Sequence, residues 1–103
     1  MIHVLARITT KPGKRDAVLE AFRNNRPTVL AEAGCIEYVS VIDAEGAGKI
    51  QTPIGADTFF VVEKWESIDA LRAHAAAPHM ATYAATVKDL LAERTIHVLS
   101  PVN

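Results

Sequence analysis

The spacing of hydrophobic positions changes several times along the chain, and each change marks a new element. Residues 2–9 are rich in branched side chains and end at a Lys-Pro-Gly turn at 11–13, which predicts a strand. After this turn the apolar residues recur three and four positions apart, with charged residues between them. This spacing predicts an amphipathic helix that Pro27 kinks or restarts near Arg26 and that Gly34 ends.

Two later runs, 35–43 and 58–65, are also typical of strands. Strict alternation puts Ile36 and Tyr38 on one face of the first run, and both runs carry apolar side chains on both faces. The connection between them, 44–57, holds three glycines and Pro53. It is longer than an ordinary hairpin loop, so it is either a lid or a tolerated insertion.

The C-terminal part predicts another helical region followed by a strand. Ser67 is a good N-cap for a short alanine-rich helix, and Pro78 breaks this helix and begins the next. Residues 93–99 then return to strand character. The order strand, helix, strand, strand, helix, strand predicts the ferredoxin-like βαββαβ fold of the α+β class. Helices cover one face of such a sheet, so the apolar residues of the other face predict a homodimer.

Length and composition narrow the function classes. The 103 residues predict a single domain, 1–103, without a separate cofactor-binding half. A formal net charge of -1 gives no basic excess for nucleic acid, and no run approaches the length of a membrane span. The one cysteine, Cys35, fits a reducing compartment, so we expect a cytoplasmic protein with no nucleic-acid or membrane partner.

Several polar residues are candidates for chemistry. His74 is predicted to lie beside Trp65, as a general base or hydrogen-bond donor to a substrate or as a helix-capping residue. Tyr38 offers a hydroxyl to the same pocket or is simply packed in the sheet. Glu63 shares a strand face with Trp65 and is either a buried carboxylate with a raised pKa or a structural partner.

Other candidates have plainer alternatives. Arg7 binds an anionic group of a substrate or pairs with a neighbouring carboxylate. His3 and His97 are expected to be a cross-strand pair. His74 and His79 are five residues apart, whereas two metal ligands on one helix need a spacing of three or four, so no metal site is predicted.

Four segments together resemble the antibiotic biosynthesis monooxygenase family. They are Arg7-Ile8 through Lys11-Pro12-Gly13, the run Glu32-Ala33-Gly34-Cys35-Ile36-Glu37-Tyr38, the run Phe60-Val61-Val62-Glu63-Lys64-Trp65-Glu66-Ser67, and Ala70-Leu71-Arg72-Ala73-His74 with Pro78-His79-Met80. The resemblance spans nearly the whole chain and implies a dimeric α+β barrel with a pocket between sheet and helices. It also implies that Trp65 lines this pocket and that His74 and His79 match helix histidines of the quinol-monooxygenase-like branch.

Two branches of the family differ from this chain. Val61 stands where the anthrone-oxidising branch has Asn, and Ala6-Arg7 stand where the haem-degrading branch has Asn. The resemblance therefore implies a cofactor-independent monooxygenase that oxidises a small aromatic quinol or phenol with O2, with His74 as the base. The alternatives are a cofactor-free isomerase of a small metabolite and a small-ligand-binding domain without catalysis.

Overall fold

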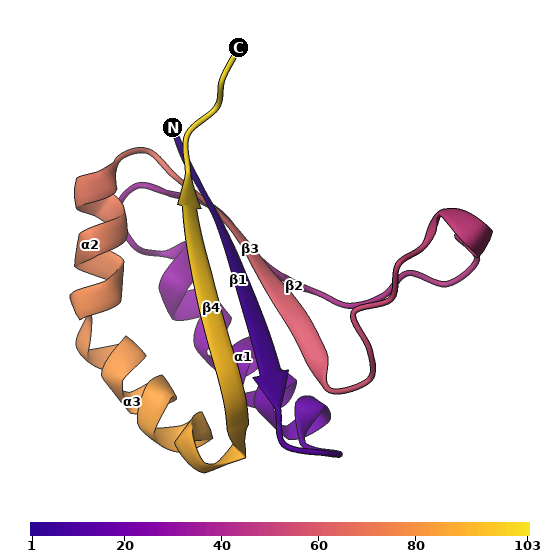
Figure 1. Cartoon of the computed structure of the whole chain (residues 1–103). Helices are drawn as coiled ribbons and strands as arrows, with labels where there is room; N and C mark the ends of the chain where they lie inside the picture. Colours follow the sequence, from indigo (N-terminus) through magenta and orange to yellow (C-terminus); the bar gives the residue numbers. More distant parts are fainter.

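The computed structural model describes residues 1–103 and has the predicted element order. The sheet consists of β1 (Ile2–Thr10), β2 (Cys35–Val41), β3 (Thr58–Trp65) and β4 (Leu91–Leu99), and the helices are α1 (Arg15–Leu30), α2 (Ile68–Ala76) and α3 (Pro78–Val87). All neighbouring strands are antiparallel, in the order β2-β3-β1-β4. The ferredoxin-like α+β fold is thereby confirmed (Figure 1).

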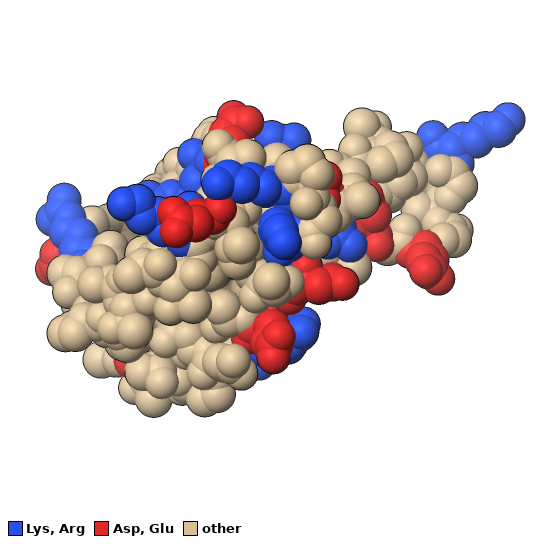
Figure 2. Space-filling view, turned by 90° about the horizontal axis from the view of Figure 1, so that it is seen from below, with Lys and Arg blue, Asp and Glu red and all other residues tan.

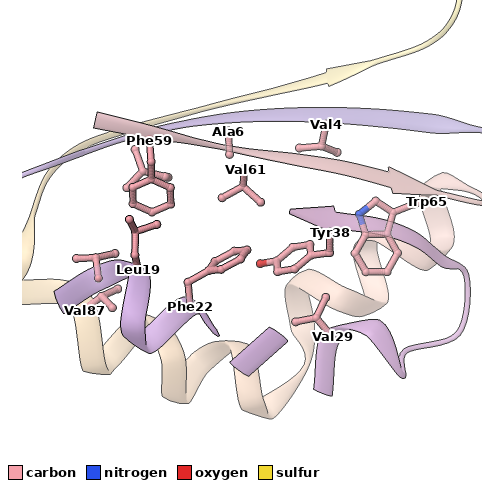
Figure 3. Close-up of a cluster of buried hydrophobic side chains, with 12 residues drawn as sticks. Val4, Ala6, Leu19, Phe22, Val29, Tyr38, Phe59, Val61, Trp65 and Val87 are labelled. Atoms are coloured by element: carbon pink, nitrogen blue, oxygen red, sulfur yellow. The ribbon is translucent and has the colours of Figure 1, made fainter. Parts of the chain in front are cut away.

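The helices all cover the same face of the sheet. Alternate residues of β3 on that face, Phe59, Val61, Glu63 and Trp65, are buried, as their spacing predicts. Phe22 of α1 stacks on the ring of Tyr38 from β2, with ring centroids 5.0 Å apart. Figure 3 shows these two rings in the layer between sheet and helices, with Trp65 at one end of it.

The helix α1 differs from its prediction because it continues through Pro27 without a restart. Phe22 and Val29, one on each side of the middle of the helix, are both buried in the core. Packing therefore outweighs the loss of one backbone hydrogen bond at the proline. Ser67 does cap α2, because its hydroxyl accepts the N–H of Ala70 at 3.1 Å, and Pro78 does begin α3.

The strand β2 also departs from the prediction at its start. A shift of register between Cys35 and Glu37 places Cys35 opposite Trp65 and Tyr38 opposite Glu63, so Ile36 is displaced outward and is 48% exposed. Strict alternation is wrong here because one residue is inserted into the ladder. His3 lies opposite Leu99 and His97 opposite Leu5, so the two histidines are not directly paired.

The connection between β2 and β3 projects from the opposite side of the molecule to α2 and α3 (Figure 1). Figure 2 shows the same projection, with charged side chains along it. The carboxylate of Asp43 accepts the backbone N–H groups of Ile54 and Gly55, and these hydrogen bonds lower the pKa of Asp43. The projection therefore lies away from the helix-covered layer of its own chain. None of the helices has both the length and the apolar character that a membrane span requires.

Gly34 provides a test of how closely α2 approaches the end of α1. Its φ is +81°, and a Cβ added there would lie 2.6 Å from the Cβ of Ala70. We expect Gly34→Ala to lower the free energy of unfolding by about 3 kcal/mol, because backbone strain and overpacking add. Gly46 has the same φ of +81° with no atom near its added Cβ, so Gly46→Ala isolates the backbone strain of about 1 kcal/mol. Urea denaturation compares the two, and equal losses would contradict the close packing.

Candidate active site

A single large cavity lies between the sheet and the helices α2 and α3. Its volume is about 930 Å³, and most of the residues that line it are apolar. Its floor is formed by side chains of β1, β3 and β4, and its roof by α2 and α3. Ile96 and Val98 of β4 line it and are each 49% exposed, so the cavity opens beside β4.

Small side chains leave the space for this cavity. The roof has six alanines, of which one, Ala77, joins the two helices; the others are Ala75, Ala76, Ala81, Ala84 and Ala85. Alanine does not reach the sheet, and Pro78 begins a new helix immediately after Ala77. The helices α2 and α3 therefore arch over the floor, as Figure 1 shows. The volume is within the range of pockets that bind small organic molecules.

Glu63 is the acidic side chain that lines the cavity. It is 7% exposed, and its Oε1 accepts the indole N–H of Trp65 at 2.9 Å. Burial raises the pKa of Glu63, Glu32 adds to that effect, and the bond from Trp65 and the nearby His74 oppose it. Glu63 is thus a carboxyl group with an increased tendency to hold a proton inside an apolar pocket.

His74 projects from α2 and is also buried, with 6% of its surface exposed. Its ring lies 4.6 Å from the ring of Trp65 and 5.4 Å from that of Tyr38, measured between centroids. The Nδ1 atom lies 2.7 Å from a carboxylate oxygen of Glu32, which follows α1 in the chain. A carboxylate only accepts, so this contact places the proton on Nδ1 and leaves Nε2 as the basic nitrogen.

Glu32 also holds His79, the second helix histidine. The other carboxylate oxygen lies 2.6 Å from Nε2 of His79, and the amide oxygen of Asn25 lies 3.1 Å from Nδ1 of the same ring. The amide nitrogen of Asn25 donates to the sulfur of Met80, which fixes the orientation of this amide. His79 therefore faces an oxygen acceptor at each ring nitrogen, and an imidazolium satisfies both.

Two phenol hydroxyls also line the cavity. Burial raises the pKa of Tyr38 far above its ordinary value and that of Tyr83 to about 12. Both groups therefore remain protonated at neutral pH and can donate a hydrogen bond to a bound oxyanion.

Several of these polar atoms are free to meet a bound molecule. The Nε2 of His74, the Oε2 of Glu63 and the hydroxyls of both tyrosines have no hydrogen-bond partner in the protein, whereas the only fully enclosed side-chain atom without a partner is Nε of Arg15. The free atoms thus reach the cavity, which their residues line. No group of three or more His, Cys, Asp or Glu side chains could hold a metal ion.

The structure brings five of the six predicted site residues together. Trp65, His74 and His79 form one cluster with Tyr38 and Glu63. Tyr38, Glu63 and His74 line the cavity, whereas Trp65 is fully buried beside His74 and, like His79, does not line it, so the expected role of Trp65 as a lining residue is wrong. Arg7 lies on the opposite face of the sheet, because Ala6 and Ile8 beside it face the cavity. A substrate in this cavity does not contact Arg7.

Sequence reasoning missed Glu32, Asn25 and Tyr83 as site residues. Glu32 had one usable signal: a carboxylate just after a helix C-terminus is disfavoured by the helix dipole, so its presence there needs another partner. That partner is supplied by two histidines 42 and 47 residues further along the chain.

Fold and site together define a ferredoxin-like protein with an apolar cavity and a buried acid–base cluster. Residues 1–86 match the family described as antibiotic biosynthesis monooxygenase. Over 103 residues, 98% of both chains, the protein is 40% identical to "Probable quinol monooxygenase YgiN" from Escherichia coli strain K12.

Solved structures show the same fold. PA3566 from Pseudomonas aeruginosa aligns over 99% of this chain and 94% of its own, with a TM-score of 0.81 and 24% identity. Rv0793 from Mycobacterium tuberculosis aligns over 99% and 95%, with a TM-score of 0.79 and 27% identity. The chain therefore belongs to the antibiotic biosynthesis monooxygenase family, which confirms the resemblance of its motifs.

The raised pKa of Glu63 predicts how stability depends on pH. Its folded pKa lies above the ordinary 4.5, so the folded state binds more protons and the free energy of unfolding falls as pH rises from about 4.5. Glu63→Gln keeps an acceptor for Trp65 and removes the buried charge. We expect this variant to be at least as stable as the wild type at pH 7 and relatively less stable at pH 4. Urea denaturation at both pH values measures this, and a constant difference would contradict the raised pKa.

Proposed function

We propose that this chain is a cofactor-independent monooxygenase that oxidises a small aromatic quinol or phenol with O2. The observation that carries the proposal is His74, whose Nδ1 is bonded to Glu32 and whose Nε2 is left free in an apolar cavity. Support comes also from the family match and from the relative whose name includes quinol monooxygenase.

The proposed reaction begins with removal of a proton. His74 Nε2 takes the proton of a substrate hydroxyl, and the Glu32 carboxylate stabilises the resulting imidazolium. The hydroxyls of Tyr38 and Tyr83 donate hydrogen bonds to the phenolate. Because the walls are mainly apolar, water is excluded and these polar contacts are strengthened.

The electrons come from the substrate in this proposal. The phenolate reduces O2 and a carbon–oxygen bond forms to the ring. The oxygen–oxygen bond then breaks, so that one oxygen atom stays on the ring and the other leaves as water. A quinol and O2 thus become a hydroxyquinone and water, and both electrons and protons balance. In this proposal Glu63, whose pKa burial raises, exchanges a proton with the oxygen that leaves.

Oxygen uptake tests the proposed base. Protein free of metal and flavin should consume O2 with a menadiol-type substrate faster than autoxidation does. We expect His74→Ala to lower this enzymatic rate by about 100-fold, as loss of a general base does. Imidazole added to the buffer should restore part of the activity. An unchanged rate in His74→Ala would exclude His74 as the base.

A variant of Glu32 tests how much activity depends on the partner of His74 while the His74 side chain itself is kept. Glu32→Gln should lower kcat by at least about tenfold, because a Gln has one acceptor oxygen where Glu32 uses two, and because no negative charge then stabilises the imidazolium of His74. Glu20→Gln, on an exposed position of α1, is the matched control and should retain full activity. Turnover of substrate without O2 uptake would instead indicate an isomerase, and stable binding without a product would indicate a binding protein.

We also propose that two copies pack through the sheet face that no helix covers. Its apolar side chains include Leu5 at 36% exposure, Val41 at 39% and Leu99 at 42%. Val62 lies in the middle of this face, because it is opposite both Leu5 and Val39. An uncovered apolar face of this kind favours association.

A charge at the centre of the uncovered face should disrupt the dimer. Val62→Lys is expected to convert a homodimer into a monomer, because its ammonium group would lose water on association. Asn24→Lys, on the exposed side of α1, adds the same charge elsewhere and should leave the dimer intact. Light scattering after size-exclusion chromatography measures the mass of each variant. A monomeric wild type would refute this assembly.

A further inference from the structure

The acidic side chain and two of the cationic side chains that line the cavity lie in different parts of it. Glu63 and His74 lie together near Trp65, whereas Lys88 follows α3 and Arg94 belongs to β4. Neither Lys88 nor Arg94 has a carboxylate within ion-pair distance. A third cation, Arg72, lies beside Asp69 and is mostly exposed, so it adds little.

The strand register gives the separation between the two groups. Val4 of β1 is opposite both Glu63 and Val98, and Ile8 is opposite both Phe59 and Arg94. Glu63 and Arg94 are therefore offset by four residues along β1, which corresponds to about 13 Å at a rise of about 3.3 Å per residue. They also lie on the two strands that flank β1, about 9.6 Å apart, so the backbone positions of the two residues are about 16 Å apart. Ala6 and Ile96 form the floor between them, and both are apolar.

This geometry excludes Arg7 as the group that meets an acidic substrate and offers Arg94 in its place. Arg7 is opposite Thr95 on the uncovered face, whereas Arg94, one position earlier on β4, is opposite Ile8 and lines the cavity. An unpaired cation beside an apolar wall attracts an anion more strongly than the same cation in open water.

We propose that the cavity selects an elongated aromatic substrate with a hydroxyl at one end and a carboxylate or sulfonate at the other. The hydroxyl lies at His74 and Glu63, and the anionic group lies at Arg94 and Lys88. Because the backbone positions that carry the two groups are about 16 Å apart, we expect two fused rings to meet both groups better than a single ring does, and a cavity of about 930 Å³ has room for them. The identity of the reacting end rests on the proposed function, whereas the anion-binding end does not.

Binding of unreactive probes tests the inference without catalysis. The probes are 6-hydroxy-2-naphthoate, its neutral carboxamide, and the single-ring anion 4-hydroxybenzoate, measured by calorimetry at low ionic strength. We expect the naphthoate to bind about tenfold more tightly than the carboxamide, since two exposed cations contribute up to about fivefold each. The single-ring anion should bind more weakly than the naphthoate, and salt should reduce the advantage of the charged probe.

Variants at the two cations locate the effect. Arg94→Gln combined with Lys88→Gln should abolish the advantage of the naphthoate over the carboxamide and leave binding of the carboxamide unchanged. Arg23→Gln, at an exposed position of α1 that does not line the cavity, is the matched control and should retain the advantage. Since both cations are exposed, the double variant should fold normally, and its melting temperature checks this.

Three outcomes would overturn the inference. They are equal binding of naphthoate and carboxamide by the wild type, an advantage that persists in the double variant, and an advantage that Arg7→Gln abolishes. Failure of the proposed function is distinguishable from these results. If probe binding discriminates as expected but O2 uptake is absent, then the anion site stands and the oxidation chemistry is refuted.

Discussion

The cavity depends on the hydrogen bonds that the Glu32 carboxylate makes with two histidines. It follows α1 in the chain, and its two oxygens bind one histidine from each of the helices that form the roof. Alanine-rich helices bury little apolar surface, so such a roof gains less from packing than a leucine-rich one would. Hydrogen bonds to a charged group contribute about 1.5–3 kcal/mol each when they are buried. The hydrogen bonds of Glu32 therefore compensate for the small apolar surface that the alanine-rich roof buries.

The same carboxylate connects stability to chemistry. With one oxygen Glu32 selects the tautomer of His74, and with the other it holds His79, whose second ring nitrogen meets Asn25. A shift of α2 relative to α1 would break the contact between Glu32 and His74, and Nε2 would then no longer be fixed as the nitrogen that accepts a proton. Glu63 has the opposite character: its burial is unfavourable for the fold and useful for proton exchange. The site combines one charged group that strengthens the structure with one that weakens it.

Much of the fold was predictable from local patterns, and most of the site was not. The buried face of β3 follows from period-two alternation, and Ser67 and Pro78 act at helix starts through their own backbone chemistry. The inserted residue at Ile36 and the unbroken α1 depend on the neighbouring strand and on packing against the sheet, which no local pattern contains.

For the site, the missed residue Glu32 acts only through partners distant in sequence, whereas the position of Arg7 could have been found. Because Val4, Ala6 and Ile8 alternate as buried residues, Arg7 between them must face the other way.

The alanines of the roof have a consequence for how this protein can diversify. Their methyl groups set the size of the cavity and take no part in the side-chain hydrogen bonds of the acid–base cluster, so exchanging single alanines for larger residues would reshape the space one position at a time. Substrate range and reactivity are therefore encoded by separate residues, and a lineage could change the first while conserving the second.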